Sequence, residues 1–173
     1  MSIKDLYSIY LKHPVISTDT RKIQLNSLFF ALKGENFDGN KYADEALENG
    51  ASYAVISDES YQKDNRYILV EDTLVSLQDL ARHHRNQLTI PIIGITGSNG
   101  KTTTKELMKS ALQEKFNTYA TFGNLNNHIG VPLSLLSITK EDEIAIIEMG
   151  ANHQKEIEFL VNICNPDCGL ITN

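Results

Sequence analysis

The first half of the chain alternates short apolar runs with amphipathic segments. Apolar runs at residues 28–32, 53–56 and 67–70 have the length of buried strands, and residues 15–17 form a shorter extended segment. Apolar positions at helical spacing predict three helices, over residues 2–12, 41–49 and 73–86. The polar stretch between the first long strand and the second helix, residues 33–40, predicts a loop. Together these elements predict one small α/β unit over residues 1–86.

The second half has a stricter alternation of strand and helix. Strands are predicted over residues 92–96, 118–120, 144–147 and 168–172, and helices over residues 101–115 and 154–163. The strands are apolar throughout, which is typical of a parallel sheet covered by helices on both faces. We place the boundary between the units at residues 87–90, so the second unit covers residues 87–173. Because the sequence stops directly after a strand, we expect this unit to be the first part of an incomplete domain with an exposed sheet edge that promotes self-association.

Composition narrows the class of protein. The chain has 173 residues, a net charge of −6, 41% hydrophobic residues and 22% charged residues, as in ordinary soluble globular proteins. An acidic chain without a basic run is a poor candidate for binding nucleic acid, and no stretch approaches the roughly 18 apolar residues of a membrane span. The N-terminus lacks the pattern of a signal peptide, so we expect a cytoplasmic protein. Cys164 and Cys168 have no further metal ligands nearby, and no zinc site is predicted.

The strongest functional signal is a glycine-rich segment between a predicted strand and a predicted helix. Such a junction can bind phosphate through backbone N–H groups and the start of the helix. Lys101 could neutralise the β- and γ-phosphates, and the Thr102 hydroxyl could bind Mg²⁺. The general pattern G-x-x-x-x-G-K-[ST] would place its first glycine at Ile95, so a purely structural turn is the alternative. The residues expected to contact the nucleotide are Gly97, Ser98, Asn99, Gly100, Lys101, Thr102 and Thr103.

Glu148 follows the apolar strand at residues 144–147. Acidic side chains at the carboxyl ends of parallel strands face the ligand crevice of open α/β sheets. Glu148 is therefore a candidate ligand, with Thr102, for a magnesium ion that bridges nucleotide phosphates. A solvated acid at the end of a strand is the alternative.

An amide-rich segment at residues 121–128 follows another predicted strand. Asn126 and Asn127 could orient a substrate through uncharged hydrogen bonds, although asparagine is also common in structural turns. His128 is interpreted as a local hydrogen-bonding residue rather than a catalytic base. His83 and His84 lie on a helix expected to be mostly solvated, and neither is given a role.

The first unit contains a second group of polar residues. Hydroxyls, an acid and an arginine between short elements could bind the base, ribose and phosphate of a nucleotide. The candidates after the first extended segment are Ser17, Thr18, Asp19, Thr20 and Arg21. Those in the predicted loop at residues 33–40 are Lys33, Gly34 and Asn36.

These segments together resemble the Mur ligase family, which includes the folylpolyglutamate synthetases. Residues 97–103 resemble the family's ATP loop, which has the form Thr-Gly-x-x-Gly-Lys-Thr and so explains the displaced glycine. Residues 148–151 are similar to its Mg²⁺-binding segment, and residues 17–21 and 30–39 to its uridine-nucleotide-binding N-terminal domain. The resemblance covers nearly the whole chain. Residues 123–127 and 130–132 are most similar to the family member that couples D-Ala-D-Ala to a UDP-muramoyl tripeptide.

The resemblance implies an ATP-dependent amide ligase of peptidoglycan precursor synthesis. Its cofactors would be ATP and Mg²⁺, and its substrates UDP-N-acetylmuramoyl-tripeptide and D-Ala-D-Ala, joined through an acyl phosphate. Lys101, Asn126 and Asn127 would be the catalytic residues, the two amides by orienting the substrate. Members of the family also have a complete central domain and a third domain, so we expect residues 1–173 to be an inactive fragment. The alternatives are the related ligase that adds the third amino acid and a nucleotide-binding module without ligase activity.

Overall fold

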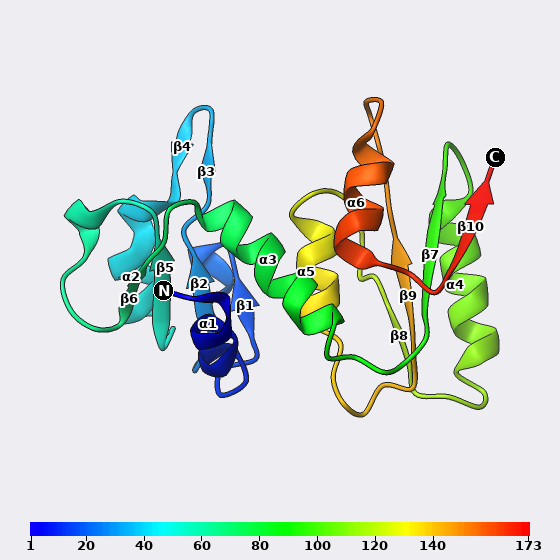
Figure 1. The fold of residues 1–173 in the computed structure, drawn as a ribbon, viewed down its shortest axis with the longest axis horizontal. Helices are drawn as coiled ribbons and strands as arrows, with labels where there is room; N and C mark the ends of the chain where they lie inside the picture. The colour runs from blue at the N-terminus through cyan, green and yellow to red at the C-terminus, as the bar shows by residue number, and fades with distance from the viewer. The chain divides into compact units, whose positions relative to one another are not determined.

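The computed structural model describes residues 1–173 and divides them into two compact units, Met1–Leu80 and Ala81–Asn173. The division falls within helix α3 (Thr73–Arg85). Each unit contains a four-stranded parallel sheet (Figure 1). The predicted α/β class and parallel sheets are confirmed. No helix in the chain combines the length and the apolar character needed to traverse a lipid bilayer.

The sheet of the first unit has the strand order β1-β2-β5-β6, with all neighbours parallel. Its strands are β1 (Ile16–Ser17), β2 (Leu28–Phe30), β5 (Tyr53–Ile56) and β6 (Tyr67–Leu69). Strand β2 is buried on both faces, which explains why its sequence is a continuous apolar run. The short helix α2 (Ala43–Glu48) packs its alanines against β5 to complete the core.

Two helices, unlike α2, begin where side chains satisfy their free N–H groups. Ser2 and Asp5 form a reciprocal capping box at the start of α1 (Ile3–Tyr10). At α3, Asp72 Oδ1 accepts hydrogen bonds from the backbone N–H groups of Leu74 and Val75, at 2.7 and 2.9 Å. A cap of this kind stabilises a helix by about 1 kcal/mol.

The prediction of a loop over residues 33–40 is wrong in part. A small antiparallel hairpin, β3 (Lys33–Gly34) and β4 (Phe37–Asp38), occupies this segment and is visible in Figure 1. The one-turn helix η2 (Gly39–Tyr42) follows it, and two further one-turn helices are η1 (Thr20–Lys22) and η3 (Glu59–Tyr61). The fully buried Asn40 fixes the segment, because its side-chain oxygen accepts a 2.9 Å hydrogen bond from the N–H of Ser57.

The sheet of the second unit has the order β10-β7-β9-β8, again all parallel. Its strands are β7 (Ile92–Gly97), β8 (Thr118–Ala120), β9 (Ile144–Glu148) and β10 (Cys168–Thr172). Its helices are α4 (Lys101–Leu112), α5 (Gly130–Leu136) and α6 (Glu156–Cys164). Right-handed crossovers place α4 on one face and both α5 and α6 on the other (Figure 1). Strand β7 lies beside β9, with Ile95 opposite Glu148. The segments that follow these two strands therefore lie together at the carboxyl ends of the strands.

The sequence pattern did not predict helix α5. Its seven residues are nearly all buried, so they lack the polar face that reveals an amphipathic helix. The Oδ1 atom of Asn127 accepts hydrogen bonds from the N–H groups of Ile129 and Gly130, at 3.1 and 2.9 Å, and so supports the start of α5.

The expectation of a mostly solvated helix around His83 and His84 is also wrong at its C-terminal end. His84 is buried, with Nε2 3.1 Å from the carbonyl oxygen of Ile138, and burial lowers the pKa of its imidazole. The neighbouring Arg85 is buried as well, and its guanidinium donates to the carbonyl oxygens of Cys164 and Asn165. These contacts connect the end of α3 to the end of α6 within the second unit.

Candidate functional site

The glycine loop, residues 97–100, connects β7 to α4 in a conformation that only glycine adopts readily. Gly97 has φ of 141° and Gly100 has φ of 81°. Helix α4 begins directly afterwards without a side-chain cap, so its first N–H groups lack intrahelical acceptors. Lys101 Nζ donates to the carbonyl oxygens of Gly97 and Ser98, at 2.6 and 3.4 Å. The predicted strand, turn and helix are all present, and a helix that begins after a glycine turn is an arrangement that can bind an anion.

Glu148 occupies the centre of the candidate site. Its side chain is 2% exposed, so it is not the solvated acid of the alternative interpretation. Oε2 accepts a 3.0 Å hydrogen bond from Thr102 Oγ1, and Oε1 accepts a 2.8 Å hydrogen bond from Asn126 Nδ2. The backbone N–H of Glu148 donates to Thr121 Oγ1 at 3.0 Å. The structure therefore brings together three predicted site residues from three separate segments.

Lys105 is part of the same cluster, although the sequence reasoning missed it. It lies one turn after Lys101 on α4, is 1% exposed, and donates to the carbonyl oxygen of Thr121 at 2.7 Å. Its ammonium group lies 3.9 Å from Glu148 Oε2. The signal that could have revealed it is helical spacing, because Lys101, Thr102 and Lys105 share one side of α4.

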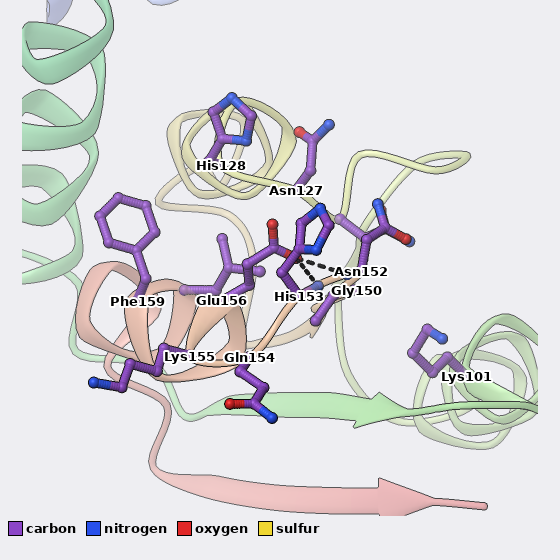
Figure 2. A pocket seen from close by; sticks show the side chains of 13 residues that line it. Lys101, Asn127, His128, Gly150, Asn152, His153, Gln154, Lys155, Glu156 and Phe159 are labelled. Atoms are coloured by element: carbon purple, nitrogen blue, oxygen red, sulfur yellow. Dashed lines mark hydrogen bonds between the residues drawn. The ribbon is translucent and has the colours of Figure 1, made fainter.

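A pocket of about 630 Å³ shares Asn126 with this cluster, and Figure 2 shows the side chains that line it. It is lined by Lys101, Asn126, Asn127, His128, Gly150, Ala151, Asn152, His153, Gln154, Lys155, Glu156, Phe159 and Leu160. The lining thus combines the start of α4, the amide-rich segment, the segment that follows β9 and the start of α6. Of the predicted nucleotide-binding residues, only Lys101 lines this pocket, whereas residues 97–100 form the turn beside it.

Residues at the start of α6 line one wall of this pocket and were not predicted. Glu156 Oε2 accepts hydrogen bonds from the N–H groups of Asn152 and His153, at 2.6 and 3.0 Å (Figure 2). These two bonds hold the pKa of Glu156 below its usual range. An acid in the first turn of a predicted helix is a recognisable signal for this arrangement.

The structure assigns Asn126 and Asn127 to two different positions. The side chain of Asn126 contacts Glu148, and its carbonyl oxygen accepts a 2.7 Å hydrogen bond from the N–H of Gly150. A Cβ atom at Gly150 would lie 3.0 Å from the Asn126 side chain, so the glycine permits this close approach. Asn127 uses its side-chain oxygen on the backbone of α5, which leaves its amide nitrogen for the pocket.

The first unit has a separate pocket of about 540 Å³. It is lined by Thr18, Asp19, Thr20, Arg21, Phe29, Phe37, Tyr42 and Glu45. Arg21 forms a two-point contact with Asp19, at 2.9 and 2.8 Å, and these hydrogen bonds lower the pKa of Asp19 to about 2. The rings of Phe37 and Tyr42 stack with their centroids 5.3 Å apart. Four of the predicted residues therefore share this pocket with an aromatic pair that was not predicted.

The remaining predicted residues of the first unit lie elsewhere. Ser17 is buried and its hydroxyl donates to the carbonyl oxygen of Asp19. It therefore stabilises the backbone of residues 17–19 without lining the pocket. Lys33 and Gly34 form strand β3, and Asn36 lies in the turn of the hairpin. None of these four residues lines the pocket. The hairpin carries Phe37 at its end, and this aromatic residue is the part of the segment that reaches the pocket.

The oxygen atoms around Glu148 match the chemistry of Mg²⁺. This ion prefers oxygen ligands and is commonly held by one or two protein groups together with substrate phosphates and water. Thr102 Oγ1 and Glu148 Oε2 are 3.0 Å apart beside the glycine loop, so both oxygens can face one ion. The residues present therefore fit the predicted magnesium site.

Comparisons with known proteins agree with this arrangement. Residues 14–88 match a model described as "Mur ligase family, catalytic domain", and residues 95–173 match one described as "Mur ligase middle domain". The chain is 44% identical over 161 residues to a UDP-N-acetylmuramoyl-tripeptide–D-alanyl-D-alanine ligase of Bacillus subtilis. That alignment covers 91% of this chain and 35% of the relative, so the chain spans about a third of the length of the curated proteins it matches.

Solved structures of Mur ligases are also similar to this chain. A MurF crystal structure from Acinetobacter baumannii superposes with a TM-score of 0.82 and 39% identity, covering 90% of this chain and 34% of that one. MurF ligase from Thermotoga maritima, solved in complex with ADP, gives a TM-score of 0.79 and 36% identity, covering 91% of this chain and 36% of that one.

The two positive-φ glycines of the loop provide a test of its packing. An alanine at Gly100 would meet no atom within 4 Å, so it should cost only backbone strain, about 1–2 kcal/mol. An alanine at Gly97 would also be strained by its positive φ and would in addition overlap Thr172 of β10. We expect Gly97→Ala to lower the free energy of unfolding more than Gly100→Ala, as measured by urea denaturation. Equal losses would show that the loop does not pack against β10 as described.

Proposed function

The chain belongs to the Mur ligase family, and we propose that it is part of an ATP-dependent ligase that joins D-Ala-D-Ala to UDP-N-acetylmuramoyl-tripeptide. The observation that carries the ATP-dependent part is the contact between Glu148 and Thr102 beside the glycine loop. The choice of substrates is supported by the relatives that bear this activity in their names. In this proposal the protein acts in the cytoplasm in peptidoglycan precursor synthesis.

We propose a division of labour between the two parts of the chain. Residues 1–86 would bind the uridine nucleotide of the UDP-sugar, in the pocket that Asp19, Arg21 and the aromatic pair line. Residues 87–173 would form the first part of the ATP-binding domain. The stacked rings of Phe37 and Tyr42 offer a flat apolar surface of the kind on which a base can stack.

The reaction requires negative groups to approach one another. An amine does not attack a free carboxylate at neutral pH, so the substrate carboxylate would first attack the γ-phosphate of ATP, which gives an acyl phosphate and releases ADP. The amine of the dipeptide then displaces the phosphate. Lys101 and the N–H groups at the start of α4 would offset the repulsion between carboxylate and ATP. Mg²⁺ bound by Thr102 and Glu148 would supply further positive charge at the phosphates.

The two asparagines would have different roles. Asn126 donates to Glu148 Oε1 and would act through Glu148 by fixing its orientation, which makes it a positioning residue. Asn127 has its oxygen engaged by α5, and its amide nitrogen would orient a substrate in the pocket. Their contribution would be alignment of the reacting groups rather than proton transfer.

Lys101 provides the first test of this function. Its ammonium group now contacts loop carbonyls and would turn to the phosphates, so Lys101→Ala should weaken ATP binding with little effect on folding. We expect a loss of about 1.5–3 kcal/mol in binding to residues 1–173, measured by calorimetry with Mg²⁺ present. In a full-length ligase, dipeptide-dependent ADP release should fall roughly 10²-fold.

The matched control for Lys101 is Lys140→Ala, which removes the same charge from an exposed position outside the pocket. This variant should bind ATP as the wild type does. If Lys101→Ala and Lys140→Ala bind ATP equally well, Lys101 has no part in nucleotide binding. ADP release that does not depend on the dipeptide would instead favour a different member of the family.

Arg21 tests the proposed uridine-nucleotide site. Arg21→Ala should weaken binding of UDP by about 1.5–3 kcal/mol, the size of one charge-assisted contact, and leave ATP binding unchanged. Arg66→Ala is a close control, because Arg66 pairs with Asp64 two residues earlier at the same 2.8 Å distance but lies outside the pocket. Calorimetric titration of UDP into both variants gives the comparison. Equal UDP affinity in the two variants would remove Arg21 from the site.

A further inference from the structure

Lys105 is a charged side chain that the proposed reaction does not use. It is 1% exposed, and its ammonium group contacts the carbonyl oxygen of Thr121 and Glu106 Oε1, at 2.7 and 3.0 Å. The third neighbour is Glu148 Oε2, at 3.9 Å. A buried ammonium is costly unless charged and polar partners surround it, so its position needs an explanation.

The surroundings of Glu148 indicate what Lys105 does. Its closest hydrogen-bond partners, Thr102 and Asn126, are neutral, and Lys105 is the one cation within 4.0 Å of its carboxylate. Removing one member of a buried ion pair leaves an uncompensated charge, which is strongly destabilising. Lys105 is therefore the group that balances Glu148 before any metal ion arrives.

We propose that Lys105 is a counter-ion that fixes the position of the Glu148 carboxylate. By doing so it disfavours binding of a free divalent cation at Glu148 and favours a cation that is already bound to the nucleotide. This inference rests on the proposed function, because it concerns the same cation position. A free divalent cation would meet a carboxylate that is already balanced, together with a nearby ammonium that repels it. A cation that arrives with ATP brings its own compensating negative charge, and the phosphates gain from Lys105 as well as from Lys101.

A gain in cation affinity distinguishes this role from a purely structural one. Replacing Lys105 with the neutral, similarly long methionine should strengthen binding of a free divalent cation. Loss of packing alone would weaken it. The helix also carries Lys109, a partly exposed lysine one turn later, so Lys109→Met is a control for the change in net charge.

The experiment uses residues 1–173 and Mn²⁺ as the probe, with affinity measured from the electron paramagnetic resonance signal of the free ion. We expect Lys105→Met to bind Mn²⁺ at least about tenfold more tightly than the wild type in the absence of nucleotide. Lys109→Met and Lys105→Arg should match the wild type. Combining Glu148→Gln with Lys105→Met should abolish the increase in Mn²⁺ affinity. Mn²⁺ affinity of Lys105→Met equal to or below that of the wild type would overturn the proposal.

A second measurement covers the case in which Lys105→Met does not fold without a metal ion. The variant that combines Lys105→Met with Glu148→Gln has no buried charge to balance, so it should unfold at a higher urea concentration than Lys105→Met alone. Equal or lower stability of the combined variant would contradict the pairing. Both measurements omit ATP. A wild-type chain that fails to bind ATP would therefore count against the proposed function while the test of Lys105 still gives its own result.

Discussion

The buried carboxylate of Glu148 is the constraint on which the second unit's site depends. A carboxylate that is 2% exposed must have hydrogen bonds and a balancing charge. The structure provides them from two segments, Thr102 and Lys105 of α4 and Asn126 after β8, which surround the carboxylate at the end of β9. The same contacts hold the start of α4, the amide-rich segment and the end of β9 together at the carboxyl ends of the strands. The requirement to satisfy one buried anion therefore also assembles the surroundings of a nucleotide and its cation.

The parallel sheet makes this assembly possible. Because β7 and β9 are neighbours in register, with Ile95 opposite Glu148, the loop after β7 and the acid at the end of β9 meet without any long connection. The first unit uses a similar plan for a different pocket, in which a polar segment after β1 lies beside aromatic residues from the hairpin and η2. The two candidate sites, one in each compact unit of a chain that spans about a third of its curated relatives, thus have pockets of different chemistry.

Sequence reasoning was most successful where local pattern and chemistry coincide. Apolar runs predicted the strands of both sheets. The glycine loop and Glu148 were recognised because glycines and an acid that directly follow apolar strands are typical of nucleotide-binding sites. It failed where tertiary burial decides the outcome. Helix α5 is buried on nearly all sides and shows no helical period, His84 became buried through its contact with Ile138, and Lys105 looks like a surface lysine until the fold encloses it. Lys33, Gly34 and Asn36 were included with the first-unit site because a polar segment does not reveal that it forms a hairpin of which Phe37, and none of these three residues, lines the pocket.

The most direct test of the account is the magnesium dependence of ATP binding in Glu148→Gln, which keeps the shape of the side chain and removes its charge. Calorimetric titrations of ATP into residues 1–173 would be performed with Mg²⁺ and with chelator, and circular dichroism would establish that the variant is folded. The account predicts that Mg²⁺ strengthens ATP binding by the wild type at least about tenfold and has little effect on the variant, because Glu148 is the only charged protein ligand proposed for the ion. An equal effect of Mg²⁺ on both proteins would contradict the central role given to Glu148.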